Sequence, residues 1–103
     1  MAQIIYNVTT KVRQEVSDEW LLWMKEEHVS KIMATGCFSK AVILKLREVD
    51  DSDDPTYAVQ YHAPNEQDYK RYLEDFATNF RSDALTKWRD KIVSFRTVLE
   101  VVN

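Results

Sequence analysis

The chain has 103 residues, a formal net charge of −3 and 30% charged residues, which is typical of one folded domain and not of a disordered segment. The acidic balance argues against a surface built for nucleic acid or anionic lipid. The glycine count of one excludes the glycine-rich loops that cradle phosphates, because those loops bring backbone amides close to the phosphate.

The first half of the chain predicts a strand, a helix and a second strand. β-Branched residues alternate along residues 4–12 (IIYNVTTKV), as in a strand. A helix is then expected from Ser17, as its N-cap, to about Thr35, with Gly36 in the left-handed conformation that ends helices. Residues 37–49 (CFSKAVILKLREV) predict the second strand.

The second half predicts a hairpin partner, a helix and a last strand. DDSDDP (50–55) lacks the glycine and terminal glutamate of a calcium loop, so we interpret it as a solvated turn before a strand at 56–63. Asn65 is expected to cap a helix, with Asp68 at the capping-box position. Because the apolar stripe of that helix drifts beyond residues 81–83, we expect a bend or a second short helix there. A long strand should follow at 91–102.

The predicted order β-α-β-β-α-β indicates a ferredoxin-like α+β fold in one domain over residues 1–103. In this arrangement a four-stranded antiparallel sheet carries both helices on one face. The other face has no helix to cover it, and whether it needs a cover depends on its side chains.

Strand alternation assigns side chains to these two faces. We assign the more apolar alternates to the helix side: Ile4, Tyr6, Val8, Val42, Leu44, Leu46, Tyr57, Val59, Tyr61, Val93, Phe95, Leu99 and Val101. The opposite set is mixed in character. It is either a solvated sheet face or a face that closes against a second copy, leaving a cavity lined by Asn7, Lys45, Gln60, His62 and Arg96.

The segments IIYNVT, EWLLWMKEEHVSKIMATGCF, YAVQY and SFRTVLEVV resemble the signature blocks of a small bacterial family known as domain of unknown function 4286. The resemblance implies a ferredoxin-like fold of the dimeric α/β-barrel type and no particular activity. The pattern His28, Gly36, Phe38 is also similar to that of small dimeric-barrel enzymes, such as antibiotic-biosynthesis-type monooxygenases, muconolactone isomerases and ethyl tert-butyl ether degradation proteins. Those enzymes often carry a histidine in the first helix, and shared fold alone does not transfer their chemistry.

His28 is the candidate catalytic residue. It lies on the row Trp20–Met24–His28–Ile32 at helical spacing, so it points with apolar residues. It is either a buried imidazole with satisfied nitrogens or a general acid or base. Trp23, on the polar arc of the same helix, is either a partner contact or an ordinary exposed residue.

Arg96 with Gln60 and Lys45 is the most promising ligand-binding group. A guanidinium beside an amide can hold a carboxylate or carbonyl with directed hydrogen bonds. The competing interpretation is an ion pair of Arg96 with Glu100 or Glu48. The single cysteine and the two histidines have no metal-ligand spacing, so no metal and no cofactor are expected.

The resulting hypothesis is a homodimeric barrel that binds a small polar organic ligand between sheet and helix. If it is catalytic, the resemblance implies cofactor-independent oxidation or isomerisation, with His28 as acid or base and Arg96 with Gln60 holding the substrate. A second hypothesis is RNA binding through Tyr6, Tyr57 and Tyr61, and a third is a structural interaction module. The acidic charge weighs against the RNA hypothesis, so we expect no nucleic-acid partner. The N-terminus has no targeting leader and no segment is apolar enough to span a bilayer, so we expect a soluble, cytoplasmic protein without a membrane partner.

Overall fold

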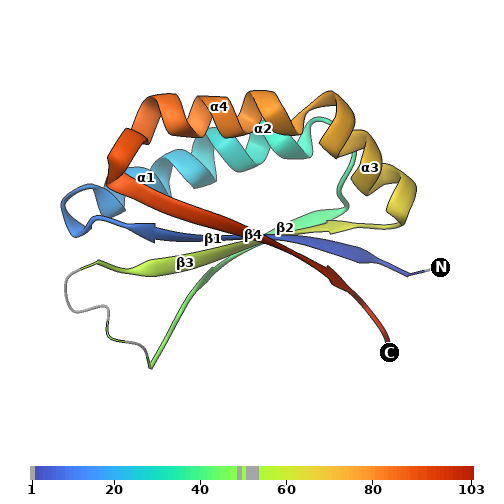
Figure 1. Cartoon of the computed structure of the whole chain (residues 1–103), viewed down its shortest axis with the longest axis horizontal. Helices are drawn as coiled ribbons and strands as arrows, with labels where there is room; N and C mark the ends of the chain where they lie inside the picture. Colours follow the sequence, from blue (N-terminus) through green and yellow to red (C-terminus); the bar gives the residue numbers. More distant parts are fainter. Residues whose placement is uncertain (1, 49, 51–53) are drawn as a thin grey trace.

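The computed structural model describes residues 2–48, 50 and 54–103 (Figure 1). In chain order the elements are β1 (Ile4–Val12), the 3-10 turn η1 (Gln14–Val16), α1 (Ser17–Trp23), the π-helical turn η2 (Met24–His28), α2 (Val29–Met33), β2 (Lys40–Lys45), β3 (Thr56–Ala63), α3 (Glu66–Asp75), α4 (Ala77–Trp88), the 3-10 turn η3 (Arg89–Lys91) and β4 (Ile92–Glu100). Within these residues, no helix has the length and apolar character required to cross a membrane.

The strands form one four-stranded antiparallel sheet in the order β2-β3-β1-β4, with the helices on one side (Figure 1). This arrangement confirms the predicted ferredoxin-like α+β fold. We call the side of the sheet away from the helices the open face. Residues 51–53 of the predicted DDSDDP turn lie outside the described residues.

The ends of the helices follow the sequence signals in part. Gly36 has a φ of 76° and its N–H donates to the carbonyl of Met33 at 3.1 Å, as predicted for the end of the first helix. The side chain of Asn65 accepts from the N–H of Asp68 at 2.9 Å and caps α3. The expected cap at Ser17 is wrong. The preceding turn η1 has the Ser17 hydroxyl donating back to the Gln14 carbonyl, so it does not accept from the helix.

The bend in the second helical region lies at Phe76, earlier than the predicted position after residues 81–83. Phe76 has φ −129° and ψ −33° and separates α3 from α4. Tyr72 and Ala77 are both buried, although residues five apart point in different directions on a straight α-helix. The bend at Phe76 therefore allows both residues to face the sheet.

The first helix contains one π-helical turn at Met24–His28. Such a turn widens the helix, so residues five apart come closer to the same side than in an α-helix. Trp23 and His28 stack there with ring centroids 4.4 Å apart, and Trp23 also contacts Trp88 edge-on at 5.7 Å. Trp23 is therefore half-buried and not an ordinary exposed residue, although it still lines an outer groove with Glu19, Glu26 and Glu27 of the polar arc.

The face assignment is confirmed for β1 and β3 and wrong for the two edge strands. Tyr6 pairs with Tyr61 and Val8 with Val59, and all four face the helices. The same register places Ile43 and Lys45 of β2, and Ser94, Arg96 and Val98 of β4, on the helix side. The predicted helix-facing residues Val42, Leu44, Val93, Phe95 and Leu99 therefore lie on the open face, and all of them are exposed.

The error has a physical cause. The prediction assigns the more hydrophobic set of alternating residues on each strand to the core. In the two edge strands, however, both sets of alternating residues contain apolar side chains. The exposed set on the open face is the more apolar of the two. The hydrophobicity of a strand face alone does not show whether that face packs against the helices of the same chain.

We predict that Asn65→Ala destabilises the protein by about 1 kcal/mol, because the N–H of Asp68 loses its acceptor at the start of α3. Urea unfolding followed by circular dichroism measures the change. Asn79→Ala is the matched control, since Asn79 is exposed within α4 and caps no helix. A loss of stability in Asn79→Ala as large as that in Asn65→Ala would contradict the assignment.

Candidate functional site

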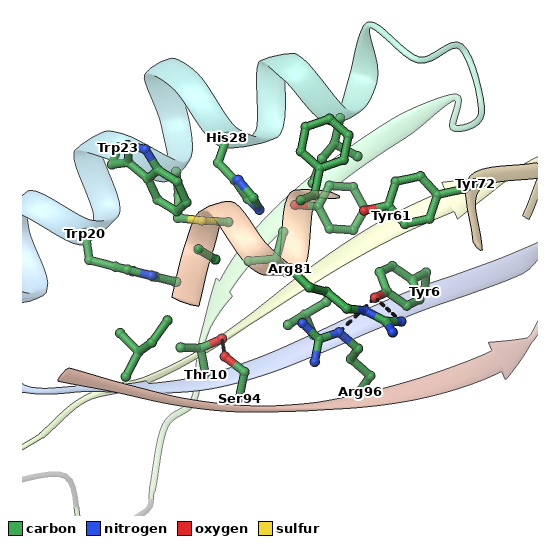
Figure 2. A pocket seen from close by; sticks show the side chains of 17 residues that line it. Tyr6, Thr10, Trp20, Trp23, His28, Tyr61, Tyr72, Arg81, Ser94 and Arg96 are labelled. Carbon is green, nitrogen blue, oxygen red and sulfur yellow. Dashed lines mark hydrogen bonds between the residues drawn. The ribbon is translucent and has the colours of Figure 1, made fainter. Parts of the chain in front are cut away.

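A cavity of about 50 Å³ lies between the sheet and the helices (Figure 2). Space of this size holds roughly three or four water-sized groups. Aromatic and aliphatic side chains form most of its wall. The polar residues in the wall are Tyr6, Thr10, His28, Tyr61, Tyr72, Arg81, Ser94 and Arg96.

Two arginines meet at the phenol oxygen of Tyr6. Arg81 of α4 donates from Nη2 at 3.1 Å and Arg96 of β4 donates from Nε at 2.9 Å (Figure 2). The helix layer and the sheet layer thus each supply one guanidinium to the same oxygen. A phenol oxygen has no more than two lone pairs, so these two bonds use its accepting capacity and leave its O–H to donate elsewhere.

Neither guanidinium is paired with a carboxylate in the part of the chain that the structure describes. There, ion pairs join Arg13 to Glu15 and Arg71 to Asp68. The interpretation in which Arg96 pairs with Glu100 or Glu48 is therefore wrong. Nε of Arg81 is buried and finds no acceptor among the described residues. The positive charge of this site is not neutralised by its own wall.

Tyrosine rings surround the two arginines. The ring of Tyr6 lies 5.5 Å from that of Tyr72 and 6.1 Å from that of Tyr61. Burial, together with the neighbouring phenols, raises the pKa of both Tyr61 and Tyr72 well above the usual range. These phenols therefore stay neutral and keep their hydrogen-bond donors at all physiological pH values.

His28 lies in the cavity wall with its ring against Trp23 and, edge-on at 5.8 Å, against Phe80. Burial lowers its pKa to about 4, although nearby Asp83 opposes the shift and Lys31 adds to it. The imidazole is therefore neutral at neutral pH. That protonation state fits a buried ring, and it is the state in which a histidine can accept a proton.

A groove of about 320 Å³ lies on the outer side of the same histidine. Trp23 and His28 line both the groove and the cavity, and charged side chains of α4 and the first helix complete the groove: Glu27, Lys31, Asp83 and Lys87. The stacked pair Trp23–His28 therefore separates the inner cavity from an open surface groove.

The predicted site residues do not form one group. Arg96 and His28 line the cavity, whereas Asn7, Gln60 and His62 lie on the open face on the other side of the sheet. Lys45 faces the helix side at the end of β2, opposite Tyr57, and does not line the cavity. The predicted grouping of Arg96 with Gln60 and Lys45 is therefore wrong, because the phase of the edge strands was inverted.

Arg81 is the site residue that the sequence analysis missed. It lies on the row Ala77–Arg81–Ala84–Trp88, where Ala77 and Trp88 are buried. A charged residue on a buried helical row is a usable signal, since such a charge needs a partner inside. The signal was hidden because residues 81–83 were expected to break the helix.

The described residues contain no group of three or more histidine, cysteine, aspartate or glutamate side chains arranged to hold a metal ion. Cys37 is buried and its thiol lies 4.0 Å from the Thr35 carbonyl.

The family model described as domain of unknown function (DUF4286) matches residues 3–102. The chain belongs to this family. A search of curated proteins found no match. The predicted family is thus confirmed over nearly the whole chain.

Solved structures share the fold of this family member at low sequence identity. A dimeric ferredoxin-like protein from an uncultured marine organism is 13% identical, with a TM-score of 0.70 and coverage of 100% of this chain and 98% of that one. A Bacillus cereus protein described as a candidate antibiotic biosynthesis monooxygenase is 16% identical, with a TM-score of 0.68 and coverage of 100% and 96%. SnoaB, a cofactor-independent oxygenase from Streptomyces nogalater, is 15% identical, with a TM-score of 0.65 and coverage of 99% and 94%.

We predict that the unfolding free energy falls by about 2 kcal/mol between pH 7 and pH 5 through His28 alone. Its pKa is about 4 in the folded protein, against the ordinary histidine value of 6.5 that applies to the unfolded chain. The unfolded chain therefore takes up the proton first as the pH falls, and stability is lost between these two values. Urea unfolding at both pH values measures the effect. His28→Phe keeps an aromatic ring and should lose this part of the pH dependence, whereas an equal fall in both proteins would contradict the assignment.

Proposed function

We propose that this protein is a homodimer in which each subunit binds a small polar organic molecule in the cavity between sheet and helices. The observation that carries the proposal is the convergence of Arg81 and Arg96 on Tyr6 inside a largely aromatic wall. Ligand sites in proteins have this character, with an apolar lining and a few directed polar groups.

The open face supports the dimer. Val42 and Leu44 of β2 and Val93, Phe95 and Leu99 of β4 are exposed there, and monomeric proteins seldom leave such an apolar sheet face in water. A second copy is the occupant that the comparisons favour, since similar structures are described as dimeric ferredoxin-like proteins. In such a dimer the two cavities lie on the outer sides of the paired sheets.

Cofactor-independent oxidation or isomerisation is the second candidate. The shared fold with SnoaB and the place of His28 in the cavity wall favour it. A neutral His28 would act there as a base, because its lowered pKa keeps the imidazole in its unprotonated, uncharged form at neutral pH.

RNA binding has less support. It depended on three tyrosines on an exposed sheet, but Tyr6 and Tyr61 are buried beneath the helices and Tyr57 packs against Trp20 at 5.2 Å. We therefore retain a soluble, cytoplasmic small-molecule-binding protein as the proposal.

We predict that the wild-type protein sediments as a dimer and that Phe95→Lys converts it to a monomer, because Val93 and Leu99, the apolar residues of β4 beside Phe95, give a buried lysine ammonium no partner. Leu85→Lys is the matched control. Phe95 and Leu85 are both 62% exposed in the single chain, but Leu85 lies on α4, away from the open face. Analytical ultracentrifugation distinguishes the species. A monomeric wild type, or a Phe95→Lys protein that remains dimeric, would refute the proposed interface.

We predict that small aromatic probes raise the melting temperature of the wild type and not of Ala84→Phe, whose added ring fills the cavity. Benzamide, phenol and benzoate are the probes, and thermal unfolding followed by tryptophan fluorescence is the measurement. Leu85→Phe is the control, since it adds a ring at the neighbouring position on the exposed side of α4. Failure of all three probes to stabilise the wild type, or equal stabilisation of Ala84→Phe, would refute a ligand cavity at this place.

A further inference from the structure

We infer that the ligand of the cavity is an organic carboxylate whose head group lies between Arg81 and Arg96, an assignment that rests on the proposed function. The first observation is the chemistry of the wall. No aspartate, glutamate, asparagine or glutamine among the described residues lines the cavity, whereas two arginines do. In a chain with a net charge of −3, this is a local concentration of positive charge and of hydrogen-bond donors.

The second observation is the way in which these donors are used. Each guanidinium donates one N–H to the phenol oxygen of Tyr6, which leaves its other N–H groups available to a ligand. Nε of Arg81 is buried without an acceptor among the described residues. A buried donor without an acceptor destabilises the protein, and an anionic oxygen placed against it would supply the missing acceptor.

The third observation is size. The cavity of about 50 Å³ matches a carboxylate group with little more. Arg96 lies on the edge strand β4 and is exposed, so the rest of the ligand extends past Arg96 toward solvent. Guanidinium groups match carboxylates with two parallel hydrogen bonds, which suits a head group of this size between Arg81 and Arg96.

Benzoate and benzamide test the inference, because they share one shape and differ in charge. Isothermal titration of the intact protein at neutral pH should give benzoate an affinity about tenfold or more above that of benzamide. Arg81→Met and Arg96→Met should each remove most of this preference, while Arg81→Lys retains part of it. Arg13→Met is the control and should leave the preference unchanged, since Arg13 is exposed and pairs with Glu15.

The outcomes separate this inference from the proposed function. If benzamide binds as tightly as benzoate and Ala84→Phe abolishes its binding, the cavity proposal stands and the carboxylate assignment is wrong. A preference for benzoate that survives in both Arg81→Met and Arg96→Met would also refute the assignment. If neither probe binds the wild type, both proposals fail together.

Discussion

The hydroxyl of Tyr6 joins the helix layer to the sheet, because arginines from both layers donate hydrogen bonds to it. Tyr6 lies on β1, next to the middle of the sheet, and its ring contacts those of Phe38, Tyr61, Tyr69 and Tyr72. Its oxygen accepts from one guanidinium of the helix layer and one of the sheet. A phenol can do both because its ring is apolar and its tip is polar. Arg81 is half-buried and Arg96 is exposed at the edge strand, and their two like charges are thereby held close together without a carboxylate between them among the described residues.

The sheet separates two surfaces with different chemistry. Aromatic and cationic groups gather under the helices, and aliphatic groups of β2 and β4 gather on the open face. A substitution on one face therefore changes that surface with little direct effect on the other. The open face also has polar side chains at its centre, among them Asn7 and Gln60, which pair across β1 and β3. Asn7 is buried there, its amide donates to Thr9 at 3.0 Å, and its carbonyl oxygen has no partner among the described residues.

The sequence predicted the elements and their order better than the site. The strand over 4–12, the hairpin partner at 56–63, the Asn65 cap and the left-handed Gly36 each depend on local signals, and each is confirmed. The site depends on the phase of β4, and that phase cannot be decided from hydrophobicity when both sides of a strand are apolar. Arg96 was therefore grouped with Gln60 across the sheet, and Arg81 was missed because the bend lies at Phe76. Tertiary pairing, and not local preference, decides these positions.

The π-helical turn at Met24–His28 rotates α2 relative to α1 about the axis of the first helix. Each residue of an α-helix rotates the chain by about 100° about the axis, so the extra residue of a π turn offsets α1 against α2 by that amount. Regular α-helical geometry over the same residues would remove this offset. Trp20, which is now buried against Tyr57, would then lie on a different face of the helix from Ile32. The irregularity thus lets one continuous helix bury both Trp20 and Ile32 in the same core.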